Sequence, residues 1–395
     1  MQLSKPLKLF TSKNWAWIFL QTVFLFFLFL FYNNGDFVLN GEEKLLTKID
    51  VAKEMLLSNP KPRYDFVFIN VGKDLEVVQD ENGGDAIITN RAKLAALFKV
   101  LATRNEHRYL LADIYFDLYS ENDSLLAVEI KKLNRVIFPK HLSDTGILPT
   151  VIPVPAAVAD YRTNVKKFSK FRLIYRDSLK TIPVTMHEEL QQVSYSTGFL
   201  GFFYNGNYCL QTFPPRYYIR PHHLLNTKEY PYFNLGELLV LSNDSLFYNQ
   251  FLQKKFIVLG NFETDIHETP IGVMPGSLIL LNTYLSLLNG KHQPGVWWFI
   301  FLFALFFIIN MFLFFGKIKV PEIAKNKIKW WQVLIKDQLK SQLANLFSVA
   351  GICLLITIIS EFMFQIKPHT FIIFIYIISW QSVIKYHTIW KEQRN

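Results

Sequence analysis

The fold of this chain is decided by residues 256–290, FIVLGNFETDIHETPIGVMPGSLILLNTYLSLLNG. An apolar run rich in β-branched residues at 256–260 is typical of a buried strand. A polar loop punctuated by proline and glycine follows at 263–276, and an apolar helix at 277–290 ends in glycine. The stretch therefore predicts a strand, a loop and a helix in succession.

The preceding sequence repeats this alternation of strand and helix patterns. Strand patterns occur at 64–72, 107–116 and 135–139, and helix patterns occur at 90–105 and 124–134. Such alternation implies crossover connections and a largely parallel sheet covered by helices on both faces. We therefore expect a mixed α/β domain. Asn205-Gly206, between aromatic-rich arms, is the strongest hairpin signal in the chain.

Four apolar segments are candidates for membrane-spanning helices. They are residues 15–32, 295–316, 346–366 and 370–387. The first is uncharged, and as a helix it would be about 27 Å long, close to the thickness of a hydrocarbon core. No small-residue cleavage motif follows it, so we interpret it as a retained anchor rather than a signal peptide. The predicted fold class is thus an extracytoplasmic α/β domain plus four transmembrane helices.

The distribution of lysine and arginine predicts the orientation. Residues 1–14 and 317–345 carry 3 and 7 lysines, and the C-terminal tail is also basic, whereas residues 33–294 contain 28 basic and 28 acidic residues. Because basic loops stay in the cytoplasm, the large segment is expected outside it. The chain's net charge of +10 then faces the lipid bilayer, which argues against a nucleic-acid partner.

These patterns predict eight consecutive parts. They are a cytoplasmic N-terminus (1–14), a first span (15–32), an extracytoplasmic domain (33–294), a second span (295–316), a basic amphipathic cytoplasmic segment (317–345), a third span (346–366), a fourth span (370–387) and a cytoplasmic tail (388–395). Both termini are expected in the cytoplasm. Cys209 and Cys353 fall in different parts, so the outer domain has no internal disulfide.

Three aspartates lie where predicted strands end. Asp74 follows the first strand, Asp113 ends the second, and Asp265 follows the strand at 256–260. Ligands of open α/β sheets bind at the carboxyl ends of strands, so these carboxylates would form a ligand site if the sheet order brings them together. The alternative is that Asp113 and Asp265 are hydrogen-bonded and cap local loops.

Asp265 and His267 alternate and would point the same way in an extended segment. Two such donors are too few for a typical metal site, so no metal and no cofactor are predicted. The sequence contains no G-x-S-x-G, Walker, H-E-x-x-H or C-x-x-C motif. We therefore predict that the protein is not an enzyme, and a hydrolase using Asp113 and Asp265 is the least favoured reading.

Three fragments, taken in order and with the membrane topology, resemble a known family. Residues 256–290, LADIYF at 111–116 and ENDSLLAVEI at 121–130 are similar to bacterial receptors with a CHASE domain of the second type, and the similarity covers about residues 60–316. Leu280, Leu281 and Asn282 stand where the family often has His-Ala-Asn. Family members also continue into a cytoplasmic output domain, for which the tail after residue 387 has no room.

The resemblance implies a sensory domain outside the bacterial cytoplasmic (inner) membrane. With the strand-end argument, it gives Asp74, Asp113, Asp265, His267, Thr269 and Asn282 as candidate ligand-binding residues. Thr269 precedes a proline, so its alternative role is to fix a turn. The expected function is a membrane-anchored, extracytoplasmic ligand-binding module that relays a signal to a separate membrane or cytoplasmic output protein, with a homo-oligomer possible. The alternative is a non-enzymatic structural subunit of a cell-envelope complex.

Overall fold

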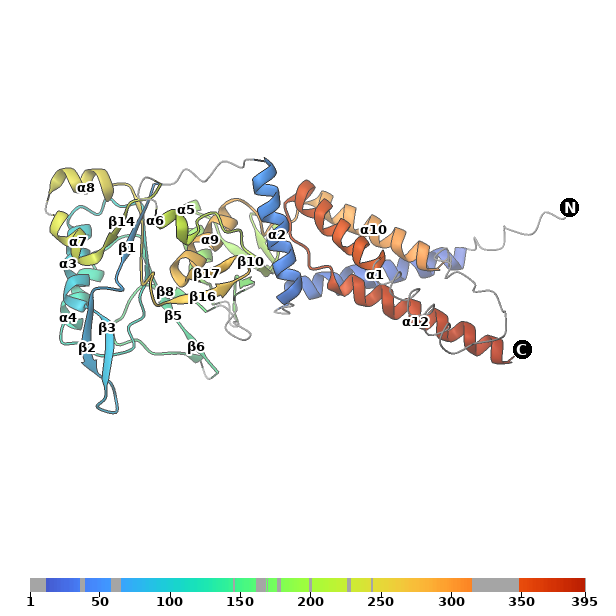
Figure 1. Cartoon of the computed structure of the whole chain (residues 1–395), viewed down its shortest axis with the longest axis horizontal. Coiled ribbons are helices and arrows are strands. Elements are labelled where there is room, and N and C mark those ends of the chain that lie inside the picture. The colour runs from blue at the N-terminus through green and yellow to red at the C-terminus, as the bar shows by residue number, and fades with distance from the viewer. Residues whose placement is uncertain are drawn as a thin grey trace, which may run out of the picture. The chain divides into compact units, whose positions relative to one another are not determined.

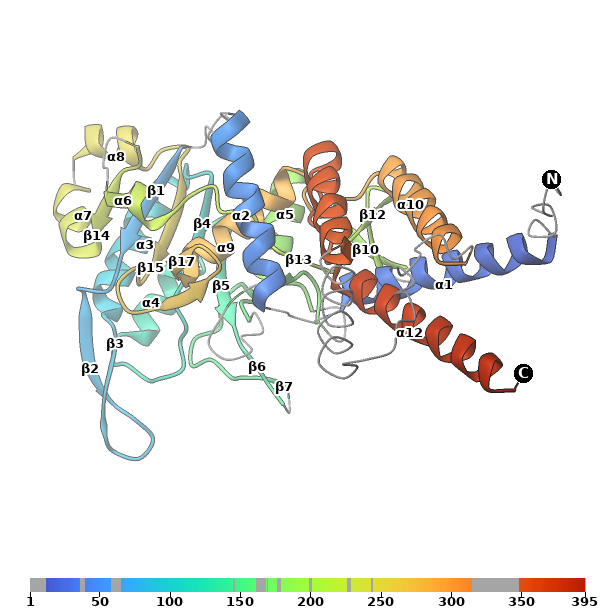
Figure 2. The same cartoon turned by 45° about the vertical axis from the view of Figure 1, so that its right-hand side comes forward.

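The computed structural model describes most of the chain. The described residues are 12–35, 40–57, 65–144, 146–160, 168, 170–175, 179–198, 201–225, 229–242, 244–314 and 348–394. The chain forms two compact units (Figures 1 and 2). Residues 1–49, 197–210 and 293–395 form one, here called the helical unit, and residues 50–196 and 211–292 form the other, the α/β unit.

The α/β unit is built on a six-stranded sheet in which every neighbouring pair is parallel. The strand order is β14-β1-β15-β4-β5-β8. These strands are β1 (Phe66–Asn70), β4 (Tyr109–Asp113), β5 (Val136–Lys140), β8 (Ala156–Val158), β14 (Tyr232–Asn234) and β15 (Phe256–Gly260). The predicted α/β class and the largely parallel sheet are confirmed.

Strand β15 is the last in the sequence, yet it lies in the middle of the sheet. It pairs with β1 on one side and with β4 on the other. The register places Gly260 level with both Asn70 and Asp113. Insertion of β15 between β1 and β4 therefore brings the carboxyl ends of three sequence-distant strands to one point on the sheet edge.

Helices cover both faces of the sheet, as Figure 1 shows. One face packs on α3 (Arg91–Arg104), α4 (Asp123–Ile130), α7 (Leu235–Leu241) and α8 (Ser245–Phe251). The other face packs on α5 (Ile182–Gln191) and α9 (Gly276–Leu288). Successive side chains of a strand point to opposite faces of the sheet, so a strand can bury apolar side chains on both faces. In β15, Ile257 and Leu259 belong to the core on the first face, while Phe256 stacks on Tyr284 of α9 on the other.

Local polar residues fix the ends of helices and turns. The Asn90 side chain accepts a hydrogen bond from the Lys93 N–H at 2.9 Å and so caps α3. Asn205 and Gly206 both have positive φ, 47° and 77°, in the turn between β11 (Gly201–Tyr204) and β12 (Asn207–Cys209). This hairpin groups with the helical unit.

The loop predicted at 263–276 is more regular than expected. It contains an antiparallel hairpin of β16 (Ile266–Thr269) and β17 (Gly272–Pro275), which leads directly into α9. A second hairpin, β2 (Leu75–Gln79) with β3 (Asp85–Thr89), follows β1. The remaining short elements are β6 (Leu142–Ser143), β7 (Gly146–Ile147), β9 (Phe171–Arg172), β10 (Tyr195–Gly198), β13 (Thr212–Phe213) and α6 (Pro221–Leu225).

The helical unit contains α1 (Ser12–Asn34), α10 (Val296–Phe314), a helix ending in a π-turn at Ser360–Phe364, and α12 (Phe371–Arg394). It also takes in the first residues of α2 (Asn40–Leu57). By length and composition, two helices among the described residues, α1 and α10, could cross a membrane.

Two of the four expected spans are thus supported by length and composition. The described apolar stretches at Ser348–Phe364 and Phe371–Val383 are shorter than a full span, although α12 itself continues to Arg394. The start of the third predicted span and the segment 317–345 lie outside the described residues, as do residues 1–11 of the predicted cytoplasmic N-terminus.

Buried polar contacts hold the helical unit together. The Asn310 Nδ2 of α10 donates to Thr22 Oγ1 of α1 at 3.2 Å, and Tyr376 OH of α12 donates to Asn310 Oδ1 at 2.5 Å. Asn33 of α1 accepts a hydrogen bond from the His369 N–H, and Glu42 of α2 accepts one from the Phe371 N–H at the start of α12. The polar side chains thus fix α1, α10 and α12 against one another.

Candidate ligand-binding cavity

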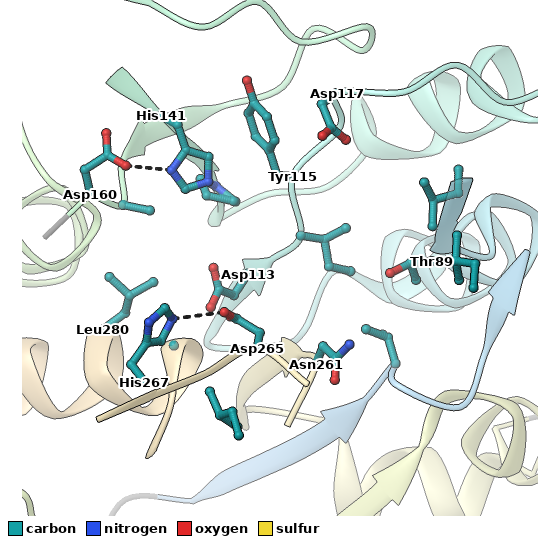
Figure 3. A pocket seen from close by; sticks show the side chains of 18 of the residues that line it. Thr89, Asp113, Tyr115, Asp117, His141, Asp160, Asn261, Asp265, His267 and Leu280 are labelled. Carbon is teal, nitrogen blue, oxygen red and sulfur yellow. Dashed lines mark hydrogen bonds and ion pairs between the residues drawn. The ribbon is translucent and has the colours of Figure 1, made fainter. Parts of the chain in front are cut away.

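A cavity of about 770 Å³ opens at the carboxyl edge of the parallel sheet in the α/β unit (Figure 3). Residues that follow β1, β4, β5 and β15 line it, together with the β2–β3 hairpin and the first turn of α9. Small-molecule sites of open α/β sheets occur at this edge, where the strand order reverses. The topology of the sheet thus creates the cavity, and the residues at the strand ends decide its chemistry.

Asp113 and Asp265 meet at the start of α9. A Cβ atom placed on Gly276 would lie 2.5 Å from Asp265 Oδ2 and 3.3 Å from Asp113 Oδ2. Glycine at position 276 therefore lets both carboxylates approach the helix backbone. Figure 3 shows the two side chains facing each other inside the cavity. The sequence prediction that Asp113 and Asp265 approach one another agrees with this geometry.

Asp113 is the electrostatically unusual group of the cavity. Burial, and next the nearby charge of Asp265, raise its pKa to about 7, although His141 and His267 act in the opposite direction. Its carboxylate forms no side-chain hydrogen bond with the part of the chain that the structure describes, and the residue is only partly buried at the cavity wall. Solvent or a bound partner therefore stabilises the charged form of Asp113.

Two histidine–aspartate pairs flank Asp113. His267 Nε2 lies 3.0 Å from Asp265 Oδ1, and His141 Nδ1 lies 2.7 Å from Asp160 Oδ1. The hydrogen bond to Asp160 raises the pKa of His141 against the effect of its burial. The rings of His141 and Tyr115 also lie nearly perpendicular to each other, with ring centroids 4.6 Å apart. These contacts fix both imidazoles at the cavity wall.

The other three candidate residues do not line the cavity. Asp74 accepts hydrogen bonds from Lys93 Nζ at 2.5 Å and from the Gly236 N–H at 3.0 Å, so it connects the loop after β1 with α3 and α7. Thr269 closes the β16–β17 turn by donating to the Gly272 carbonyl at 2.6 Å. This is the turn-fixing alternative considered for Thr269.

Asn282 is buried in α9 and holds a neighbouring segment. Its amide accepts from the Ile219 N–H at 2.9 Å and donates to the Ile219 carbonyl at 2.8 Å. The side chain thereby substitutes for a strand partner of residue 219. Asn282 supports the helix that reaches the cavity but does not face the cavity itself.

Sequence reasoning missed several polar residues of the cavity. They are Thr89, Tyr115, Asp117, His141, Asp160 and Asn261. His141 directly follows β5, and Asn261 directly follows β15, so the rule that found Asp113 could have found both. Asp160 follows a strand of only three residues, Ala156–Val158, which left no clear periodic signal.

Comparisons with known proteins assign neither a family nor a metal. No protein-family model, no curated protein and no solved structure matches the chain. The similarity to CHASE domains of the second type therefore stays a prediction. Among the described residues, no group of three or more His, Cys, Asp or Glu side chains is arranged to hold a metal ion.

Proposed function

We propose that the protein is a membrane-anchored sensory module whose α/β unit binds a small ligand in the cavity beside Asp113 and Asp265. The observation that carries this proposal is the position of α9. Gly276, the first residue of α9, and Leu280, one turn later, line the cavity. Helix α9 ends at Leu288, and α10 begins at Val296. One helix thus connects the cavity wall to a candidate membrane span.

The relay would be mechanical. Helix α9 is buried along almost its whole length, and side-chain hydrogen bonds from Asn282 and Ser286 anchor it to the segment at 216–219. A tightly packed helix shifts as a rigid element rather than deforming locally. We propose that a ligand which moves the first turn of α9 passes this movement along the chain through residues 289–295 to α10.

The location outside the cytoplasm is part of the same proposal. The lysines before residue 15 and after residue 316 favour a cytoplasmic position for both flanking segments. The α/β unit then lies outside a bacterial cytoplasmic membrane. On this proposal the shorter apolar stretches at Ser348–Phe364 and Phe371–Val383 complete a four-helix membrane bundle. A separate output protein then receives the signal. We propose ligand binding and relay, not catalysis.

Filling the cavity covalently tests the relay without knowledge of the ligand. Thr89 lines the cavity, and both native cysteines are buried. A Thr89→Cys chain in lipid nanodiscs would be modified with N-benzylmaleimide, and hydrogen exchange would be measured by mass spectrometry over residues 276–300. Asp65→Cys is the matched control, because the Asp65 side chain is 77% exposed and precedes β1 at the opposite sheet edge.

The relay predicts altered exchange through α9 and into the residues before α10 for the modified Thr89→Cys chain only. Unaltered exchange over 276–300 would contradict the proposal. Co-purification of stoichiometric extracytoplasmic partners, together with unaltered exchange, would instead support the alternative of a structural envelope subunit.

A further inference from the structure

The cavity is strongly acidic. Four aspartates line it, Asp113, Asp117, Asp160 and Asp265, and no lysine or arginine is found among the described lining residues. Asp160 and Asp265 are each paired with a histidine. Asp113 has no such partner, so the cavity carries negative charge that the protein itself does not balance.

The N-terminus of α9 does not make this negatively charged cavity suitable for an anion. Helix N-termini attract negative charge, but Asp113 and Asp265 already place carboxylate oxygens beside Gly276. An additional anion there would meet two carboxylates at short range. Burial, and next the charge of Asp265, raise the pKa of Asp113, so a second negative charge at this place is already disfavoured.

One wall of the cavity is apolar and open to solvent. Leu75, Ile87 and Ile266 line the cavity, yet they are 44%, 69% and 49% exposed. Leu75 and Ile87 belong to the β2–β3 hairpin. Exposed apolar side chains around a concave polar site are the feature expected where a ligand supplies the missing apolar contact.

We propose that the cavity binds a small organic cation that carries an apolar portion. The cationic group lies between the carboxylates of Asp113 and Asp265, and the apolar portion packs on Leu75 and Ile87. This inference rests on the proposed ligand-binding function and adds the chemical class of the ligand. A bare metal ion fits less well, because no metal-holding group of side chains is found in the described part of the chain and an ion leaves the apolar wall uncovered.

Four probes that separate charge from apolar contact test the inference. Phenethylammonium is the cation, 2-phenylethanol the neutral analogue, 3-phenylpropanoate the anion, and ethylammonium the cation without an apolar portion. Binding would be measured by isothermal titration calorimetry on the full chain in lipid nanodiscs at pH 8, with empty nanodiscs as the blank. Phenethylammonium should bind saturably and at least tenfold more tightly than the other three.

Variants locate the binding. Asp113→Asn and Asp265→Asn should each weaken phenethylammonium at least tenfold, and Asp65→Asn should leave it unchanged. Ile87→Ser, at a side chain that is 69% exposed, should weaken phenethylammonium but not ethylammonium. Melting temperatures of all variants check that each is folded. If an aspartate variant does not fold, Ile87→Ser still tests whether phenethylammonium binds in this cavity.

The outcomes separate the ligand class from the function. Tighter binding of 3-phenylpropanoate than of phenethylammonium would overturn the cation and leave a ligand-binding function standing. Equal binding of phenethylammonium to the wild-type and Asp113→Asn chains would overturn the assigned site. Absence of binding by all four probes would also overturn the inference, whereas the function would still be judged by the exchange experiment on Thr89→Cys.

Discussion

Asp113 ends strand β4 and Asp265 follows strand β15, yet both place a carboxylate oxygen beside the same glycine, Gly276. Burial, and next the repulsion between the two like charges, raise the pKa of Asp113. Proteins tolerate arrangements of this kind mainly at functional sites. The pair therefore makes specific predictions about stability as well as binding.

Replacing Asp113 with asparagine should stabilise the unliganded protein at pH 8. The folded-state pKa of about 7 lies above the ordinary value of 3.8, so the folded state binds more protons between these values and loses stability as pH rises through them. Removal of the ionisable group should raise the free energy of unfolding by about 1–3 kcal/mol more at pH 8 than at pH 5. Melting temperatures at the two pH values measure this difference.

The matched control for Asp113→Asn is Asp65→Asn. Asp65 is an exposed aspartate, and its ion pair with Lys255 lies at the surface. Its replacement should change the melting temperature little at either pH. A loss of stability for Asp113→Asn at pH 8 would show that the carboxylate is satisfied in the folded protein, against the geometry described above.

Affinity for phenethylammonium should increase with pH between about 6 and 8. Ionised Asp113 attracts the cation, and its pKa of about 7 places this ionisation in that range. Protonation of His141, which follows β5 and has a raised pKa, acts in the same direction because it adds positive charge near Asp113 at lower pH. Calorimetric titrations at several pH values would measure the trend, which Asp113→Asn should flatten. An affinity that falls over this range would contradict the assignment.

Gly276→Ala should weaken ligand binding in the cavity, although an alanine at the first residue of a helix is normally well tolerated. The new Cβ would lie 2.5 Å from Asp265 Oδ2, so the Asp265 side chain must move. We expect phenethylammonium affinity to fall at least tenfold. Gly295→Ala is the control, because a Cβ at position 295 meets no atom within 4 Å. Similar affinities for the two variants would show that the carboxylates are not confined by the helix.

Glu42 should stabilise the helical unit. Although burial opposes it, hydrogen bonding and charge from His369 and the Thr370 and Phe371 N–H groups lower the pKa of Glu42. Glu42→Gln should lower the free energy of unfolding by about 1–2 kcal/mol at pH 7. Because the folded-state pKa is depressed, this contribution is present above the ordinary carboxyl pKa and is lost as pH falls below it. Thermal melts of Glu42→Gln against the exposed-site control Lys48→Gln measure the effect, and equal melts would contradict it.

The sequence was sufficient to predict the α/β class and the edge of the sheet where the cavity lies. Parallel strands share one carboxyl edge, so Asp113 and Asp265 could be assigned to that edge from their positions alone. The same rule could not tell which way a side chain turns. Asp74 also follows a strand, but the Lys93 ammonium and the Gly236 N–H draw its carboxylate away from the cavity.

Other features depended on information that local sequence does not contain. Asp160 reaches the cavity only because the short strand β8 pairs beside β5 and brings Asp160 to His141. Asn282 was selected from a family resemblance, yet its amide pairs with residue 219, which is distant in sequence. Apolar composition does not show where a helix ends, as at the π-turn Ser360–Phe364, so composition alone did not distinguish the two longer candidate spans, α1 and α10, from the shorter described apolar stretches.

The central claim is that the acidic cavity belongs to a domain held outside the cytoplasm, and the most direct test is the accessibility of Glu81. This residue is exposed in the turn between β2 and β3. In bacterial cells producing the Glu81→Cys chain, a membrane-impermeant maleimide should label intact spheroplasts and should leave sealed inside-out vesicles unlabelled. Labelling of the inside-out vesicles alone would place the domain in the cytoplasm and contradict the account.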